Sequence, residues 1–208
     1  MHTAYSAADD YGKDMEERVM EIQVRKLTKE MADAYLNFFD QDAFSDHVEW
    51  SACYCLESHL DREENERLKG KEERRKKAKE LIESGVMSGY LVYKGDRVVG
   101  WCNAGDKNGY VPVCGNKEYM AEDGADGRTI TIYCIDIAPG YRGKGIASLV
   151  MEQVLRDAKR EGYRYVEGYP LADRELKYQY RGPVRLYEKF GFEMCRTGER
   201  ICVMRKTI

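Results

Sequence analysis

A glycine-rich turn between a strand and a helix is the segment of this sequence best suited to chemistry. Residues 129–137 are rich in β-branched and aromatic side chains, which is typical of a strand. Residues 138–145 hold three glycines and a proline, and apolar residues at helical spacing begin at Ile146. Such a junction directs successive backbone N–H groups and the positive end of a helix dipole at one point, where a phosphate can bind. The spacing fits neither a P-loop nor a dinucleotide fingerprint, so a plain strand-to-helix connection is the alternative.

Two motifs distinguish this turn from a plain connection. Residues 142–147, Arg-Gly-Lys-Gly-Ile-Ala, resemble the Arg/Gln-x-x-Gly-x-Gly/Ala signature of the GCN5-related N-acetyltransferase (GNAT) family, in which this loop holds the pyrophosphate of acetyl-CoA. Residues 186–192, Leu-Tyr-Glu-Lys-Phe-Gly-Phe, resemble the end of that family's last helix. Between them, residues 163–170 supply the strand that should splay away from the strand of Ile135. The resemblance is specific over residues 129–205 and only topological over residues 22–103.

The resemblance implies a fold and a cosubstrate. The fold would be α/β, with a mixed, mainly antiparallel central sheet whose middle strands splay apart and which is flanked by helices. Acetyl-CoA would place its pantetheine arm along the main chain of the strand and its pyrophosphate on backbone N–H groups of the turn. The residues implied in this binding are Ile135, Ile137, Arg142, Gly143, Lys144, Gly145, Ile146 and Ala147. For Arg142, a structural cap on the loop is an equally good interpretation.

The resemblance also implies direct attack by a neutral amine on the acetyl carbonyl in a ternary complex. A backbone N–H near Ile137 would polarise that carbonyl, and positioning of the two reactants would supply most of the catalysis. Tyr187 stands at the family position of the residue that protonates the departing thiolate. A phenol with a pKa of about 10 is close enough to a thiol of about 8.5 to donate usefully. Packing on the helix face is the alternative role for Tyr187.

The general base is less well defined. Asp136 and Glu167, on the two neighbouring strands, are the carboxylates closest in sequence to the expected cleft, and structural roles suit both equally well. Thr131 stands where some family members have a strand glutamate. Tyr180 stands where members often have an asparagine that contacts CoA, and residues 182–183, Gly-Pro, shorten the following helix.

A second unusual cluster lies upstream. In the fold that the resemblance implies, this segment lies between the first two helices, where the family usually builds its acceptor pocket, so Trp50, Tyr54 and His59 are predicted to line that pocket. An apolar helix face of Trp50, Cys53 and Tyr54 is the alternative. Cys53, Cys55 and His59 could be read as metal ligands, but no fourth ligand lies at a standard spacing. The sequence therefore predicts no metal site.

The remaining pattern places these groups on elements. Strands are predicted at 22–27, 90–94 and 98–103, a helix after Thr28 as its cap, and a surface helix over the charged segment 61–83. The long polar loop 105–127 is a candidate lid, and the insert 171–181 is expected to shape the mouth of the site.

Composition limits the classes of protein. The chain has 208 residues, 43% of them hydrophobic, and a formal net charge of -3, which suits one globular domain over 21–208 after a polar leader at 1–20. Near-neutral charge disfavours nucleic acid, and no apolar run approaches the roughly 18 residues of a membrane span. Seven irregularly spaced cysteines and the absence of a signal-like N-terminus predict a reducing, cytoplasmic location.

The function predicted is therefore acetyl-CoA-dependent N-acetylation of a small-molecule amine. A catalytically weak CoA-binding sensor or assembly module is the alternative from another class, and acetylation of a protein N-terminus or lysine is the other enzymatic one. The acceptor and the oligomeric state, a homodimer included, are left open by the sequence.

Overall fold

The computed structural model of the chain describes residues 22–111, 128–173, 175 and 179–208. The predicted polar leader, most of the predicted lid loop and part of the insert lie outside these residues. The strands are β1 (Ile22–Lys26), β2 (Gly89–Lys94), β3 (Arg97–Asp106), β4 (Thr129–Ile137), β5 (Tyr165–Gly168), β6 (Glu193–Thr197) and β7 (Cys202–Thr207). The α-helices are α2 (Ala32–Gln41), α3 (Arg62–Arg67), α4 (Lys71–Glu83), α5 (Ile146–Arg160) and α6 (Val184–Lys189). None of the described helices is long and apolar enough to cross a membrane.

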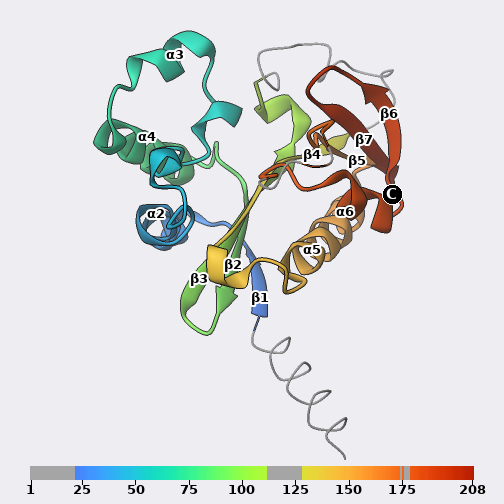
Figure 1. Cartoon of the computed structure of the whole chain (residues 1–208), viewed down its shortest axis with the longest axis horizontal. Coiled ribbons are helices and arrows are strands. Elements are labelled where there is room, and N and C mark those ends of the chain that lie inside the picture. Colours follow the sequence, from blue (N-terminus) through green and yellow to red (C-terminus); the bar gives the residue numbers. More distant parts are fainter. Residues whose placement is uncertain (1–21, 112–127, 174, 176–178) are drawn as a thin grey trace, which may run out of the picture.

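A single seven-stranded sheet organises the molecule (Figure 1). Its order is β1-β2-β3-β4-β5-β7-β6, and every neighbouring pair is antiparallel except β4 and β5. The parallel pair is joined through α5, as a parallel connection requires a crossover. The predicted mixed, mainly antiparallel sheet is confirmed.

The two middle strands separate halfway along their length. β4 pairs with β5 only from Thr129 to Ile132, which lies opposite Gly168 at the end of β5. At that level the β3–β4 register shifts, so that Tyr133 is an extra residue without a partner on β3. From there Ile135 and Ile137 continue against β3 alone, which leaves their other edge facing a gap.

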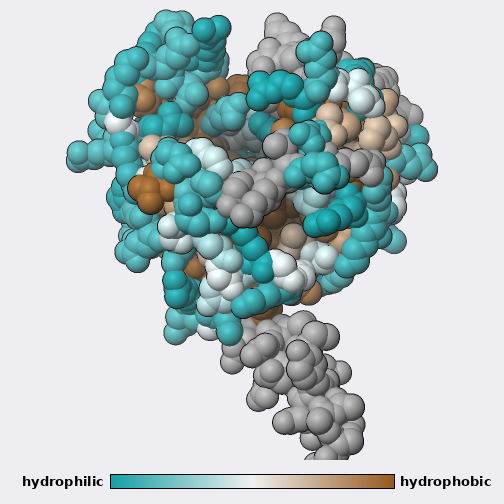
Figure 2. Space-filling view, in the orientation of Figure 1, coloured by the Kyte–Doolittle hydropathy of each residue, from teal (hydrophilic) through white to brown (hydrophobic). Residues whose placement is uncertain are grey.

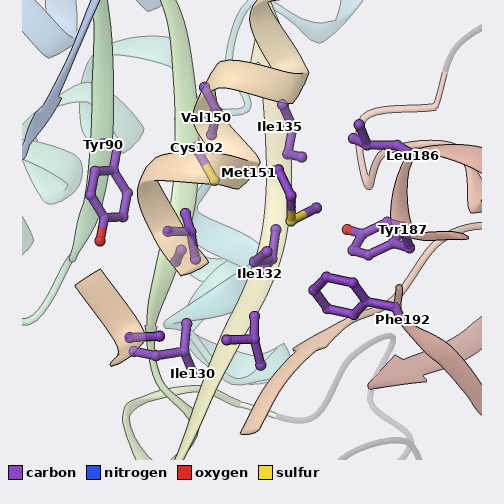
Figure 3. Close-up of a cluster of buried hydrophobic side chains, with 14 of the residues drawn as sticks. Tyr90, Cys102, Ile130, Ile132, Ile135, Val150, Met151, Leu186, Tyr187 and Phe192 are labelled. Atoms are coloured by element: carbon purple, nitrogen blue, oxygen red, sulfur yellow. The ribbon is translucent and has the colours of Figure 1, made fainter. Parts of the chain in front are cut away.

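Helices cover both faces of this sheet. On one face α5 and α6 pack on apolar residues of β2, β3 and β4. On the other, α2 and α4 pack around Trp101 and Leu91. Figure 3 shows the first core, where Tyr187 lies beside Phe192 and faces α5. Figure 2 shows that the outer surface of α3 and α4 is hydrophilic, as their charged sequence predicts.

Two local expectations and one alternative were wrong. Residues 61–83 form two helices, because Leu68 and Gly70 have extended backbone between them, and Asp61 with Glu64 forms a capping box that starts the first. Thr28 precedes a 3₁₀ turn and makes no capping hydrogen bond with its side chain. The apolar helix considered as the alternative near Trp50 is instead a pair of 3₁₀ turns, Val48–Trp50 and Leu56–Ser58.

Candidate functional site

The glycine turn connects β4 to the N-terminus of α5. Gly143 and Gly145 have φ angles of 74° and 80°, in the left-handed region that glycine adopts without strain. Gly145 is the N-cap of α5, whose 15 residues supply a helix dipole at this point. A Cβ at either glycine would meet nothing within 4 Å, so it is backbone conformation and open space, not packing, that call for glycine. This is the geometry of an anion-binding turn.

A groove of about 750 Å³ extends from this turn to the gap between β4 and β5. Seven of the eight residues predicted to bind acetyl-CoA line it; Lys144 is the exception. The opposite wall comes from the segment that leads into α6. For this segment the sequence predicted only that it shapes the mouth of the site. The groove is lined by Ile135, Ile137, Tyr141, Arg142, Gly143, Gly145, Ile146, Ala147, Ser148, Glu175, Gln179, Tyr180, Gly182, Pro183, Val184 and Arg185.

Arg142 fixes the turn from behind. Its Nε donates to the Ile137 carbonyl at 2.8 Å, and its Nη atoms reach Asp46 Oδ2 at 2.5 Å and the Ala43 carbonyl at 3.3 Å. These contacts tie β4 and the turn to the chain after α2. Of the two interpretations left open by the sequence, the structural cap is the one that these bonds support.

The main-chain groups expected to receive the pantetheine arm have partners within the chain. The Ile135 N–H donates to the Tyr180 carbonyl at 2.5 Å, and the Ile137 carbonyl accepts from Arg142. Arg181 donates from Nη1 to the Tyr133 carbonyl at 3.2 Å. Residues 180–182 therefore bridge the gap between the splayed strands, which the sequence did not predict.

Tyr187 lies directly behind this bridge. Its side chain is fully buried, and its hydroxyl donates to the Arg181 carbonyl at 2.6 Å. A Cβ built at Gly168 would lie 2.1 Å from the Tyr187 ring, so glycine at the end of β5 makes room for the phenol. Burial raises the pKa of Tyr187 above its usual value, which makes it a weaker acid than a phenol in water.

Glu167 is held by cations. It is completely buried on β5, Arg205 binds its Oε1, and Lys107 and the Tyr169 hydroxyl each lie 2.9 Å from its Oε2. Both carboxylate oxygens are therefore engaged, and Glu167 does not line the groove. This geometry suits a structural anchor between β5 and β7 better than the predicted general base.

Asp136 lies on the face of β4 that packs against the α2 side, and it too is absent from the groove wall. Its side chain is 1% exposed, and burial raises its pKa to about 7. Its Oδ2 accepts from the Cys134 thiol at 3.3 Å. The structure therefore puts Asp136 outside the groove wall, and its role as general base stays a prediction from the sequence.

The three predicted pocket residues do not form one wall. Trp50 meets the edge of Tyr180 at 5.3 Å, so it adjoins the groove, together with Phe44 at 5.4 Å from Tyr180. Tyr54 is a core residue, fully buried, with its hydroxyl on Asp40 at 2.5 Å. His59 packs on Tyr110 at 5.0 Å instead. The sequence missed Phe44 and Tyr180 as a pair because they are 136 positions apart.

The state of His59 gives a prediction on pH. Burial lowers its pKa to about 4, whereas an unfolded histidine has a pKa of about 6.5. Between these values the unfolded chain binds the extra proton, so this residue lowers stability as the pH falls from about 6.5 toward 4. In His59→Gln, the free energy of unfolding should fall less between about pH 7 and about pH 5 than in the parent chain. Urea unfolding at both pH values measures this free energy. An equal change in the free energy of unfolding between the two pH values in both proteins would contradict the prediction.

The glycine turn gives a prediction on binding. Gly145→Val adds strain at a left-handed position and a side chain where the anion should lie, so the dissociation constant for CoA should rise at least about tenfold, or about 1.4 kcal/mol. Gly140→Ala is the matched control, because Gly140 lies in the same loop without a positive φ and with open space around it. Calorimetry on both folded variants measures the effect, and unchanged affinity in Gly145→Val would refute it.

Comparisons with known proteins agree with this geometry. The model of the acetyltransferase (GNAT) family matches residues 49–192. Among solved structures, the PaiA N-acetyltransferase of Thermoplasma acidophilum in complex with coenzyme A is 14% identical, with a TM-score of 0.54, over 90% of this chain and 99% of that one. A GCN5-related N-acetyltransferase of Kribbella flavida is 17% identical, with a TM-score of 0.54, over 91% and 99%.

No curated protein matches the chain. At these identities the solved structures show a shared fold, and the family model covers more than half of the sequence. Together with the splayed strands, the glycine turn and the groove between them, the match shows that this chain belongs to the GNAT acetyltransferase family.

Proposed function

We propose that this acetyltransferase moves the acetyl group of acetyl-CoA to the amine of a small molecule. The observation that carries the proposal is the groove that runs from the N-terminus of α5 to the gap between β4 and β5. It offers an anion site at one end and the backbone edge of a splayed strand at the other. Acetyl-CoA has a pyrophosphate and an amide-bearing arm in the same order, and the PaiA relative is a complex with coenzyme A.

The Ile135 N–H is the group that we assign to the acetyl carbonyl. It already donates to one carbonyl oxygen, that of Tyr180, so its direction suits a hydrogen bond to an acceptor in the gap. Such a donor, fixed in a strand, stabilises the negative charge that develops on the carbonyl oxygen as an amine attacks. For this the thioester must take the place of the Tyr180 carbonyl, so residues 180–182 must shift when acetyl-CoA binds.

Tyr187 is assigned to the departing sulfur. The same shift would release the Tyr187 hydroxyl from the Arg181 carbonyl, because Arg181 belongs to the bridge that moves. Because burial raises the pKa of Tyr187, the phenol acts best as a hydrogen-bond donor to the developing thiolate, and full proton transfer is uphill. No carboxylate of the described groove is assigned as base, and water carries away the proton of the amine.

Aromatic side chains support a small acceptor. Tyr180, Phe44 and Trp50 pack edge to face on the α2 side of the gap, where the amine must approach. Beyond them Arg181 lies over the Tyr133 ring at 4.5 Å and 3.8 Å from Glu57. An approach lined by aromatic rings suits a compact amine. None of the six described cysteines forms a disulfide, which supports a reducing, cytoplasmic location.

A panel of acceptors tests the proposal. CoA release is measured with polyamines, amino acids, aminoglycosides and short peptides, each at matched acetyl-CoA concentration. Turnover of a small amine well above that of every peptide is the expected result. Selective turnover of peptides would favour protein acetylation, and tight CoA binding without release across the panel would favour the binding module.

A further inference from the structure

A second cluster of chemically reactive side chains lies outside the groove. Cys55, Cys134 and Asp136 each place one ligand-type atom within 4.8 Å of the others. Cys55 and Asp136 are buried, and Cys134 is half-buried. The three residues come from the turn before Leu56–Ser58 and from β4, and none of them lines the groove described above.

The spacing of these atoms fits a tetrahedral metal ion. Cys134 Sγ and Asp136 Oδ2 lie 3.3 Å apart. A tetrahedral Zn²⁺ with a Zn–S bond of about 2.3 Å and a Zn–O bond of about 2.0 Å separates two such ligand atoms by about 3.5 Å. This pair therefore needs only a small adjustment to share such an ion, and Cys55 Sγ lies within 4.8 Å of both atoms.

A buried polar atom points to a missing partner. Asp136 Oδ1 is inaccessible to solvent and accepts no hydrogen bond from the described residues. A carboxylate oxygen buried without a partner costs several kcal/mol or more as an ion, so buried charges are normally paired or bound to a metal. A cation between Asp136 and the two thiols would provide that partner.

The surroundings of Cys55 resemble the outer shell of a thiolate ligand. Asn103 donates from Nδ2 to Cys55 Sγ at 3.2 Å. Tyr110 in turn donates its hydroxyl to Asn103 Oδ1 at 2.7 Å, which fixes the amide with its NH₂ toward the sulfur. Outer-shell donors of this kind orient and stabilise metal-bound thiolates.

Cys55 is held in an unfavourable backbone conformation. Tyr54 and Cys55 have φ angles of 43° and 49°, both in the left-handed region. Tyr35 stabilises the turn by donating its hydroxyl to the Tyr54 carbonyl at 2.8 Å. Cys53, half-buried and two residues upstream, accepts a hydrogen bond from the backbone of Cys55, so a third thiol stands near the cluster.

We propose that Cys55, Cys134 and Asp136 bind a thiophilic divalent cation of the Zn²⁺ class, and that the Cys53 side chain, which lies outside the 4.8 Å group, turns toward the ion as the fourth ligand. The ligands form two pairs at i, i+2 spacing, Cys53 with Cys55 and Cys134 with Asp136. The ion would tie the turn of residues 53–55 to β4 and so stabilise the α2 side of the sheet. The proposal replaces the expectation of no metal, which rested on Cys53, Cys55 and His59 alone.

Spectroscopy of the full chain tests the proposal directly. The reduced protein is stripped with a chelator and titrated with Co²⁺, whose bonds to thiolates give charge-transfer absorption. We expect this absorption to saturate at a single equivalent of Co²⁺ and to disappear when Zn²⁺ is added. The melting temperature of the stripped protein should rise when Zn²⁺ is added. Zn²⁺ should also protect Cys134 from alkylation in the parent chain, as mapped by peptide mass spectrometry. This last measurement needs no variant.

Variants locate the site. Cys55→Ser with Cys134→Ser should abolish the absorption, and Asp136→Asn should weaken Co²⁺ binding at least about tenfold while some absorption remains. Cys195→Ser, at an exposed position on β6, is the matched control and should bind as the parent chain does. No absorption in the folded parent chain, equal absorption in the double variant, or a Cys55–Cys134 disulfide in the purified protein would each overturn the proposal.

Discussion

Tyr187→Phe is expected to lower kcat by roughly 10²-fold, the usual cost of removing one hydrogen-bond donor to the charge that develops in a transition state. The change keeps the ring that packs on Phe192 and Gly168 but removes the hydroxyl proton. Because that hydrogen bond would form with the sulfur only as the thioester breaks, the KM for acetyl-CoA should change little. Steady-state kinetics with an acceptor identified from the amine panel measures both quantities.

A structural loss must be separated from this catalytic one. Tyr187→Phe also leaves the Arg181 carbonyl without its donor, which costs about 1–3 kcal/mol of stability for a buried group. Tyr90→Phe is the matched control, because Tyr90 is a buried tyrosine of the same core that bonds to Asp157 and does not line the groove. It should lose stability but keep kcat. Parental kcat in Tyr187→Phe would remove the phenol from the mechanism and leave positioning alone.

Glu167→Gln is expected to destabilise the fold by about 3–5 kcal/mol, because it removes the anion between two buried or half-buried cations. Lys107 and Arg205 would then face a neutral amide at 12% and 16% side-chain exposure. Glu66→Gln is the control: its partner Arg62 is exposed, so its loss should cost less than about 1 kcal/mol. Urea unfolding near pH 7 measures both.

The same variant decides between the two roles of Glu167. As a structural anchor, Glu167→Gln should keep most of its kcat at a temperature where it remains folded. A loss of stability no larger than that of Glu66→Gln would refute the anchor. A collapse of kcat in the folded variant would instead restore Glu167 as the general base predicted from the sequence.

Local sequence was enough to define the cosubstrate end of the site. The turn of residues 138–145 depends on its own glycines and on the strand and helix that flank it, so its conformation is set by residues close along the chain. The hairpin of β2 and β3 is likewise local, because the two residues Gly95 and Asp96 join these antiparallel strands. These are the parts of the fold that the sequence predicted.

Only the tertiary structure decided the chemistry around that turn. The cations that hold Glu167 come from positions 60 residues before it and 38 residues after it, and Cys55 meets Cys134 from 79 residues away. Tyr54 was predicted to line the pocket because the implied fold builds its acceptor pocket in this segment, yet packing on α2 makes Tyr54 a core residue. The bridge of Tyr180 to Ile135 likewise joins segments 45 residues apart. A sequence specifies conformation mainly through neighbouring residues, whereas charge pairing, burial and ligand geometry depend on which distant side chains packing brings together.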